Sequence, residues 1–306
     1  NRKGKRMGKL KSDKTFTVVN YTLLAILTLI ILYPLYFTVI ASISEPYEVV
    51  SGNVVLWPKG FTLESYAQIF HNEEIWTGFR NSTLYTVFGT MMSLILTIPA
   101  AYALSKKNLW GRGIITTYFV IIMYFSGGLL PTYLVVRDLG LLNQPYTLVI
   151  IGSFSVYNMV VARTYYQSSI PESLYEAAEI DGCSGFGQFF RIAIPLSKPI
   201  IAVIALYYAV GRWNDFYNSL VYITNSDYYS LQQILRNILL ESQNALSAIN
   251  GDTMSSEEMA YFMRRAYLAE AMKYAIIFVS SLPMLLIYPL VQKHFVKGVM
   301  VGSVKG

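Results

Sequence analysis

The sequence is poor in charged residues and nearly lacks cysteine and histidine. Only 14% of its 306 residues are Asp, Glu, Lys or Arg, whereas a soluble domain usually carries about 25%. Cys183 is the single cysteine, which excludes an internal disulfide and a cysteine-cluster metal site. The two histidines, His71 and His294, lie far apart in the sequence. We expect them on opposite sides of a membrane, which argues against a histidine-based metal or catalytic site.

Motifs of catalysis and nucleotide binding are missing as well. The segment at residues 4–9 resembles a phosphate-binding loop, but its glycines are four rather than five positions apart and no Ser or Thr follows Lys9. We find no Gly-x-Ser-x-Gly elbow and no His-Glu-x-x-His pattern. We therefore expect no catalytic residues, no metal and no cofactor bound by this chain.

What the sequence has in excess is apolar residues, which make up 54% of the chain. They form long uncharged runs, and about 20 such residues cross a hydrocarbon core. Four uncharged runs are long enough, namely 15–44, 81–105, 113–136 and 139–162. A fifth, from Pro199 to about Ile223, is interrupted by Arg212 and Asp215, and a sixth lies between Lys273 and Lys293. The sequence predicts an all-α membrane protein with six transmembrane helices. Residues 15–44 form the first, and residues 81–293 contain the other five as the transmembrane core.

Lys and Arg in the flanks of the runs predict the orientation. They gather in the tail 1–14, the loop 105–113 and the tail 294–306, which fall on one side if the spans alternate. That side should be the cytoplasm, which leaves 45–80 and 224–272 outside. The run that follows the basic tail is too long for a signal peptide, so we expect it to remain as the first span.

Helical patterns occur in both external segments. Residues 61–70 resemble a helix, and residues 230–242 place apolar side chains on one face; these are Leu231, Ile234, Leu235, Ile238 and Leu239. Such a helix is either a docking surface or a cap on the bundle. The polar stretch 243–258 predicts a flexible loop.

Two features within the predicted spans leave alternatives open. Gly127 and Gly128, shortly before Pro131, indicate either a break in the third span or a place of close helix packing. Arg212 and Asp215 lie three positions apart and can pair on one helix face. Charge at membrane depth tends to face a cavity or a partner. This element is therefore either a lining or gate for a polar solute, or a self-satisfied pair that holds helices together.

Tyrosine is abundant, with 25 residues. Tyrosines in the third and fourth spans either belong to the interfacial belt or to helix packing, or stack on the apolar faces of sugar rings. For any single tyrosine, the belt or packing is the simpler interpretation. The candidate pathway residues are Tyr124, Tyr133, Tyr157, Asn158, Arg212, Trp213, Asn214, Asp215, Tyr217 and Asn218.

The stretch 169–199 is too polar to span a membrane. Ser169 and Glu172 have capping-box spacing, Pro171 suits a first turn, and Gly182 offers a left-handed end. One face of the predicted helix carries Leu174, Ala177, Ala178 and Asp181. A second short helix would carry Phe186, Phe189 and Phe190, before Pro195 and Pro199 lead back to an apolar run. A short helix with small residues on its face suits the groove of a partner.

These residues resemble the cytoplasmic EAA loop of ABC-type importer permeases. The matching positions are Glu176-Ala177-Ala178, Asp181-Gly182, Ile192, Ile194-Pro195 and Pro199. Ile194 stands where that family usually has Leu, and Cys183 where Ala is common; both changes nearly conserve size. The span number and the Trp213-Asn214-Asp215 element are similar to the sugar-type, MalG-like permeases. The long segment 224–272 is similar to the LplC-like subgroup, which takes up larger oligosaccharides in Gram-positive bacteria with the help of a lipoprotein.

The resemblance implies a type I ABC importer permease fold with a cytoplasmic coupling helix, in a bacterial cell membrane. It also implies a second homologous permease subunit, two ATPase subunits that hold ATP and Mg, and an extracellular solute-binding protein, either lipid-anchored or periplasmic. The solute would be a carbohydrate, most simply an oligosaccharide, and no nucleic acid is expected. The residues expected to couple to the ATPase are Glu176, Ala177, Ala178, Asp181, Gly182, Ile194 and Pro195.

Three other interpretations were weighed. An importer of the same class for a non-sugar solute is the nearest. An ion-coupled secondary carrier is disfavoured by six spans and by the lack of acidic residues in the first four. A membrane-embedded enzyme is disfavoured because no nucleophile and base pair or metal-ligand set is found.

Overall fold

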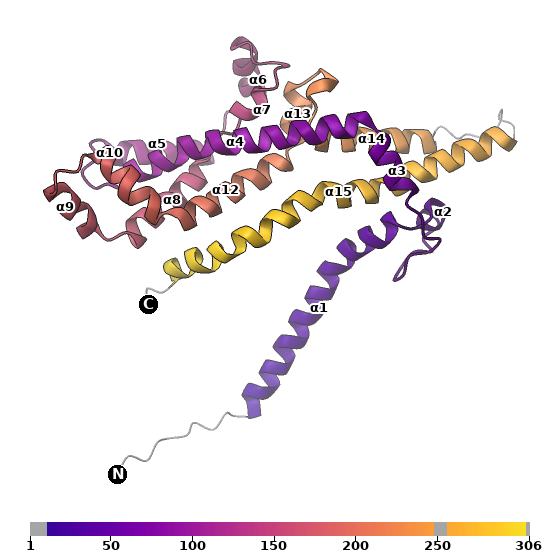
Figure 1. The fold of residues 1–306 in the computed structure, drawn as a ribbon, viewed down its shortest axis with the longest axis horizontal. Helices are drawn as coiled ribbons and strands as arrows, with labels where there is room; N and C mark the ends of the chain where they lie inside the picture. Colours follow the sequence, from indigo (N-terminus) through magenta and orange to yellow (C-terminus); the bar gives the residue numbers. More distant parts are fainter. Residues whose placement is uncertain (1–10, 248–255, 304–306) are drawn as a thin grey trace. The chain divides into compact units, whose positions relative to one another are not determined.

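The computed structural model describes residues 11–247 and 256–303, and the regular structure in these ranges is helical throughout (Figure 1). The chain divides into two compact units. The N-terminal unit combines Asn1–His71 with Leu239–Val279, and the core unit combines Asn72–Ile238 with Ser280–Gly306. Each unit is described by itself below.

Three helices form the centre of the core unit: α4 (Glu73–Ser105), α8 (Val156–Ser169) and α12 (Lys198–Trp213). Ala101, Met159 and Ala162 are fully buried between them together with Ile204. Two buried polar groups of this centre are paired with each other, since the hydroxyls of Thr97 and Tyr208 lie 2.7 Å apart. In a membrane such pairing is required, because the hydrocarbon offers no hydrogen bonds.

The N-terminal part of α4 meets the start of α14 (Leu231–Ser247) at a glycine. A Cβ added to Gly78 would lie 2.6 Å from Cδ1 of Ile234 and 3.0 Å from Cα of Leu231, so only glycine permits this approach. Leu231 and Ile234 are buried there. The first residues of the apolar face predicted for 230–242 therefore pack against α4. For this part of the helix the structure supports a cap on the bundle and not a docking surface.

The third predicted span is broken into α5 (Arg112–Tyr124) and α6 (Leu129–Asp138), which are bent by 112°. Gly128 adopts a φ of 82° and has open space where a Cβ would lie. Of the two alternatives for the Gly127-Gly128 pair, the break is confirmed and close packing at Gly128 is not.

Shorter elements connect the long helices of the core unit. They are α7 (Thr147–Ile150), α9 (Glu172–Ile180), α10 (Gly185–Gln188), the π-helical turn η1 (Phe189–Ala193), α11 (Ile194–Leu196), α13 (Tyr217–Tyr222) and the 3-10 turn η2 (Ser226–Tyr228).

The N-terminal unit contains α1 (Lys11–Ser42), α2 (Pro46–Val50), α3 (Glu64–His71) and the first part of α15 (Ser256–Ser303). The end of α1 packs on α2 and the loop that follows it through four buried residues, Ile40, Ala41, Val49 and Val54. Phe37 meets Tyr274 of α15 edge to face, with ring centroids 5.4 Å apart. The helix predicted over 61–70 is present as α3.

The described helices support three to five membrane crossings. Phe16–Ser42, Glu73–Ser105 and Met259–Ile287 are long and apolar enough individually. Two bent pairs qualify if each is one span: α5 with α6, and Gly185–Leu196 with Lys198–Trp213, which are bent by 78°. The predicted run 139–162 is not one helix. Residues 139–146 form no helix, α7 covers Thr147–Ile150, and α8 begins only at Val156.

Two other predicted segments have different boundaries in the structure. The helix expected between Lys273 and Lys293 begins at Ser256 and continues to Ser303. The polar stretch 243–258 is helical up to Ser247, and residues 248–255 lie outside the described residues. Residues 1–10 and 304–306, which hold most of one predicted tail and the end of the other, also lie outside them.

Candidate functional site

The stretch 169–199 contains the short helix α9, whose end is formed as predicted and whose start is not. The N–H of Cys183 donates to the carbonyl of Ala178 at 2.8 Å, and that of Gly182 donates to Glu179 at 3.0 Å. With Gly182 at φ 74° this is a Schellman motif. The predicted capping box is wrong: Ser169 is the last residue of α8, and Pro171 occupies the N-cap without a side-chain hydrogen bond.

The two faces of α9 differ sharply in exposure. Ala178 is buried, whereas Glu176, Ala177 and Asp181 are exposed. Ile180 is 87% exposed. Of the residues predicted to face a partner, Ala178 therefore faces its own subunit, and the outward surface includes Ile180 instead.

Two consecutive lysines at the end of α4 hold α9 in place. The Nζ of Lys106 lies 3.0 Å from the ring centroid of Tyr175 and 4.9 Å from that of Tyr102. Lys107 donates to Glu172 at 2.6 Å. Tyr102 extends the contact, since its ring lies 5.0 Å from Phe189. The stretch 169–199, called the coupling stretch below after the role that the resemblance implies, is thus tied to α4 by a cation–π contact and by an ion pair.

The charges at this junction influence one another. Burial lowers the pKa of Lys106, while Glu172 and Glu179 oppose that effect. The hydrogen bond from Lys107 lowers the pKa of Glu172. Burial also raises the pKa of Tyr175, so its phenol stays protonated. At neutral pH the junction therefore consists of two lysine cations, a glutamate anion and a neutral aromatic ring.

The second half of the stretch alternates between buried and exposed aromatic residues. Phe189 is buried, but Phe186 and Phe190 are 82% and 60% exposed. Ile194 is half-buried and Pro195 is exposed. A cavity of about 920 Å³ lies between this half, α9 and the end of α4. Its lining includes Tyr102, Lys106, Glu179, Cys183, Gln188 and Phe189.

The second candidate site lies where α12 ends, and its arginine has other partners than predicted. Arg212 donates from Nη1 to the carbonyl of Leu148 at 2.6 Å, and from Nη2 to the hydroxyls of Ser93 and Ser153 at 3.2 and 3.1 Å. A Cβ on Gly89 would overlap the guanidinium. The predicted pair with Asp215 is not formed, and Arg212 has no ion pair among the described residues.

The residues after Arg212 divide into internal and outward ones. Trp213 is buried and donates from its indole nitrogen to the carbonyl of Ser280 at 2.9 Å. Asp215 accepts from the backbone and the side chain of Asn218 at 3.0 and 2.6 Å. Asn214 and Tyr217 are exposed. The exposed side chains of Asn214 and Tyr217 are therefore the part of this element that a solute could contact.

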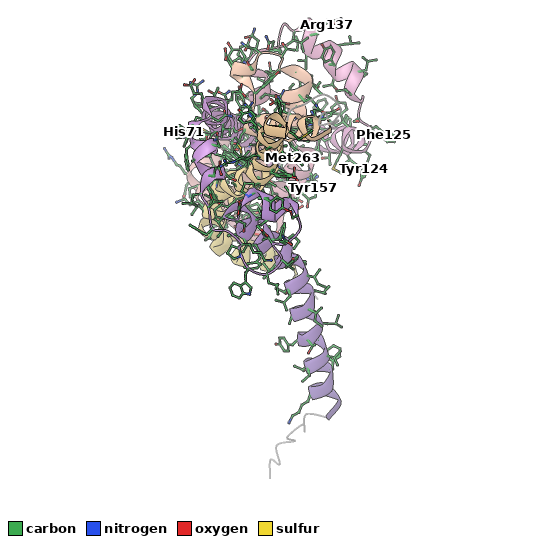
Figure 2. The ribbon with its side chains drawn as sticks, turned by 90° about the vertical axis from the view of Figure 1, so that its right-hand side faces the viewer. His71, Tyr124, Phe125, Arg137, Tyr157 and Met263 are labelled. Carbon is green, nitrogen blue, oxygen red and sulfur yellow. The ribbon has the colours of Figure 1, made fainter. Side chains whose placement is uncertain are left out.

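The tyrosines and Asn158 also separate by environment. Tyr124 and Tyr157 are 74% and 60% exposed, whereas Asn158 is buried. Figure 2 shows Tyr124 and its neighbour Phe125 projecting outward at one edge of the core unit. Tyr133 is half-buried and stacks on Tyr222, with ring centroids 6.2 Å apart and planes 17° apart. One face of the Tyr133 ring is therefore already covered.

The sequence analysis missed the role of Lys106, Lys107, Tyr102 and Tyr175. The lysines served there only to predict orientation. No local pattern joins position 106 to position 175, so only the packing of α4 against the coupling stretch could reveal the contact. Within the described residues no cluster of His, Cys, Asp and Glu is suited to a metal ion.

Comparison with known proteins gives consistent matches over nearly the whole chain. The family model described as "Binding-protein-dependent transport system inner membrane component" matches residues 75–301, which include both candidate sites. Protein LplC of Bacillus subtilis (strain 168) is 38% identical over 300 residues and 98% of each chain. The polygalacturonan/rhamnogalacturonan transport system permease protein YtcP of the same organism is 37% identical over 96% of this chain and 99% of that protein.

A solved structure is similar as well. It is the crystal structure of a bacterial ABC transporter involved in the import of the acidic polysaccharide alginate. One of its chains matches with a TM-score of 0.82 and 33% sequence identity, covering 94% of this chain and 99% of that one.

Proposed function

Because the chain belongs to the family of binding-protein-dependent transport system inner membrane components, we propose that it forms half of a pathway through which an ATP-driven importer moves an oligosaccharide. The chain is a non-catalytic permease of an ABC importer and a multi-pass inner membrane protein. In the proposed transporter it pairs with a second, homologous permease, two ATPase subunits bind on the cytoplasmic side, and a solute-binding protein delivers the sugar from outside.

The proposed topology has six crossings, with both termini in the cytoplasm. They are α1, α4, the broken pair α5–α6, α7–α8, α12 and α15. The positively charged flanks described above support this orientation. It places the stretch 169–199 in the cytoplasm, where the exposed residues Glu176, Ala177, Ile180 and Asp181 would meet an ATPase subunit.

The observation that carries the choice of an oligosaccharide is the full-length similarity to carbohydrate transport proteins. The names of two relatives specify polygalacturonan/rhamnogalacturonan and galactooligosaccharides. The exposed Tyr124, Tyr157 and Tyr217 support the same class of solute, because aromatic rings stack on the apolar faces of sugars while Asn214 offers hydrogen bonds.

The test is uptake by the complete transporter. The chain is reconstituted in proteoliposomes with its partner permease, ATPase and binding protein, and labelled oligosaccharides are supplied in neutral and acidic series. We expect uptake of one series that requires both ATP and the binding protein. Replacing Tyr124 and Tyr157 by Ala should reduce uptake several-fold, whereas Tyr21→Ala, on the exposed surface of α1, should not.

Two results would overturn the proposal. Uptake driven by an ion gradient, with this chain alone and without ATP, would indicate a secondary carrier. ATP-dependent uptake of a non-sugar solute, with no uptake of any oligosaccharide, would be consistent with an ABC importer but would refute the proposal that its solute is a carbohydrate.

A further inference from the structure

The loop between α2 and α3 turns back along α1 in the N-terminal unit. Tyr33 and Tyr36 of α1 donate from their hydroxyls to the carbonyls of Val55 and Leu56, at 3.1 and 2.5 Å. The chain then returns to the end of the helix, where the N–H of Glu45 donates to the carbonyl of Lys59 at 2.9 Å. The tip of the loop, residues 54–57, is therefore held beside the last turns of a transmembrane helix.

The depth of the tip follows from helix geometry. Tyr36 and Tyr33 precede Ser42, the last residue of α1, by six and nine positions, or roughly 9 and 14 Å at the usual rise per residue. The apolar span Phe16–Ser42 has 27 residues, more than the about 20 that cross the hydrocarbon. Tyr33 and Tyr36 thus lie near the boundary between acyl chains and headgroups, and so does the loop tip.

The chemistry of the tip suits that depth. No charged residue occurs between Glu48 and Lys59. Val55, Leu56 and Trp57 are 52%, 60% and 76% exposed, while Val54 is buried against α1 and α2. The two carbonyls that would be costly near hydrocarbon already accept tyrosine hydroxyls. Two carbonyls of the tip are therefore paired within the N-terminal unit, and the apolar side chains of Val55, Leu56 and Trp57 are left exposed.

We propose that residues 54–57 form an interfacial anchor that inserts into the lipid leaflet around the C-terminal end of α1, the outer leaflet in the proposed topology. Val55 and Leu56 contact the acyl chains, and Trp57 lies among the headgroups, where tryptophan is enriched. The occupant is lipid because the tip lies at the boundary depth of a span whose residues 16–36 are exposed, with only its end buried against α2 and the loop. The anchor fixes the depth and tilt of α1, which helix length alone leaves open.

The test measures depth with spin labels in the complete, reconstituted transporter. In a Cys183→Ser background, which removes the only native cysteine of this chain, a nitroxide is attached at Val55→Cys or Trp57→Cys. Ser51→Cys, on the exposed end of α2, is the matched control, and the partner subunits carry no reactive cysteine. Accessibility to oxygen and to a water-soluble nickel chelate is then compared. We expect the ratio of oxygen accessibility to chelate accessibility to be several-fold higher at positions 55 and 57 than at the control position 51.

A second variant tests the cause of the depth. Replacing Tyr33 and Tyr36 by Phe leaves the two carbonyls unpaired, so the label at position 55 should move towards water. Equal access of the chelate at 57 and 51 would overturn the proposal, since the tip would then be in water. Exclusion of both reagents would overturn it too, because a protein partner would cover the tip. These readouts need neither ATP nor sugar, so they are independent of the proposed transport function.

Discussion

The coupling stretch and the Arg212–Asn218 element both interrupt apolar sequence, one before α12 and one at its end, but they use charge in opposite ways. The side chains of Glu176 and Asp181 are exposed, and their carboxylates form no hydrogen bond or ion pair among the described residues. Arg212 points inward and donates to three acceptors on other segments. The same helix is therefore flanked by exposed carboxylates and by a guanidinium whose two terminal nitrogens both donate hydrogen bonds.

The difference reflects solvent. A carboxylate in water loses little when it has no partner, so it can be kept for one. A guanidinium at membrane depth has no water to bind, so the subunit must supply acceptors. Exposed charges of the coupling stretch should therefore affect partner function, whereas the half-buried charge of Arg212 should affect stability. The following variants test this contrast from the largest expected effect to the smallest.

Arg212→Ala should give the largest loss. It leaves the carbonyl of Leu148 without its donor and opens space beside Gly89, and hydrogen bonds to charged groups contribute about 1.5–3 kcal/mol each. We expect destabilisation of roughly 3 kcal/mol, measured as a lower midpoint in thermal unfolding of the purified transporter in detergent.

The matched control is Arg137→Ala, because Arg137 forms only an exposed pair with its neighbour Asp138. Its unfolding midpoint should stay at the wild-type value. Equal midpoints for both variants would contradict the engaged role of Arg212.

Gly182→Val should have the next largest effect, and it should be on coupling. A β-branched residue is strained at φ 74°, by about 1–2 kcal/mol, although a Cβ there has open space. The end of α9 should shift, and sugar uptake per ATP hydrolysed should fall several-fold while the subunits still co-purify. Glu176→Lys, which reverses an exposed charge, should uncouple without strain; normal uptake in both variants would refute the docking of α9.

Lys106→Met should have a moderate effect of the same kind. It removes the cation between Tyr102 and Tyr175, and such contacts contribute about 0.5–2 kcal/mol. We expect sugar uptake per ATP to fall while ATP hydrolysis and assembly persist. Lys106→Arg keeps a cation over the rings and should restore most of the ratio, which a general packing defect would not predict.

Glu172→Gln should have the smallest effect, because both partners of the Lys107 ion pair are largely exposed. The lowered pKa of Glu172 means that the pair contributes above the ordinary carboxyl pKa of 4.5 and is lost as pH falls through the lowered value. The slight difference in unfolding midpoint between wild type and variant should therefore disappear in acid. A difference that grows below pH 4.5 would contradict this assignment.

The parts of the site that the sequence predicted correctly depend on local rules. The left-handed end at Gly182 was predicted, and the break at Gly127-Gly128 was one of two alternatives. Both arise because glycine adopts such backbone geometry at little cost. The helix over 230–242 follows from its apolar periodicity. None of these features needs knowledge of distant residues.

The parts that were missed depend on distant packing. Local spacing paired Arg212 with Asp215, but in the fold the carbonyl of Leu148 and two serines compete successfully for the guanidinium. The capping box failed because α8 extends through Ser169 and takes up the residue that would have been the cap. The run 139–162 looked like a span because hydropathy alone does not register the turns that divide α7 from α8.

The close approach of Gly89 to Arg212 has a genetic consequence. A side chain at position 89 would displace the guanidinium of Arg212 from its three acceptors unless the residue at 212 is smaller. The two codons should therefore change together over evolutionary time. A strain carrying Gly89→Ala and selected for growth on the transported oligosaccharide should acquire suppressors at codon 212, more than a hundred codons downstream. Positions 89 and 212 should therefore co-vary, although they lie far apart in the gene.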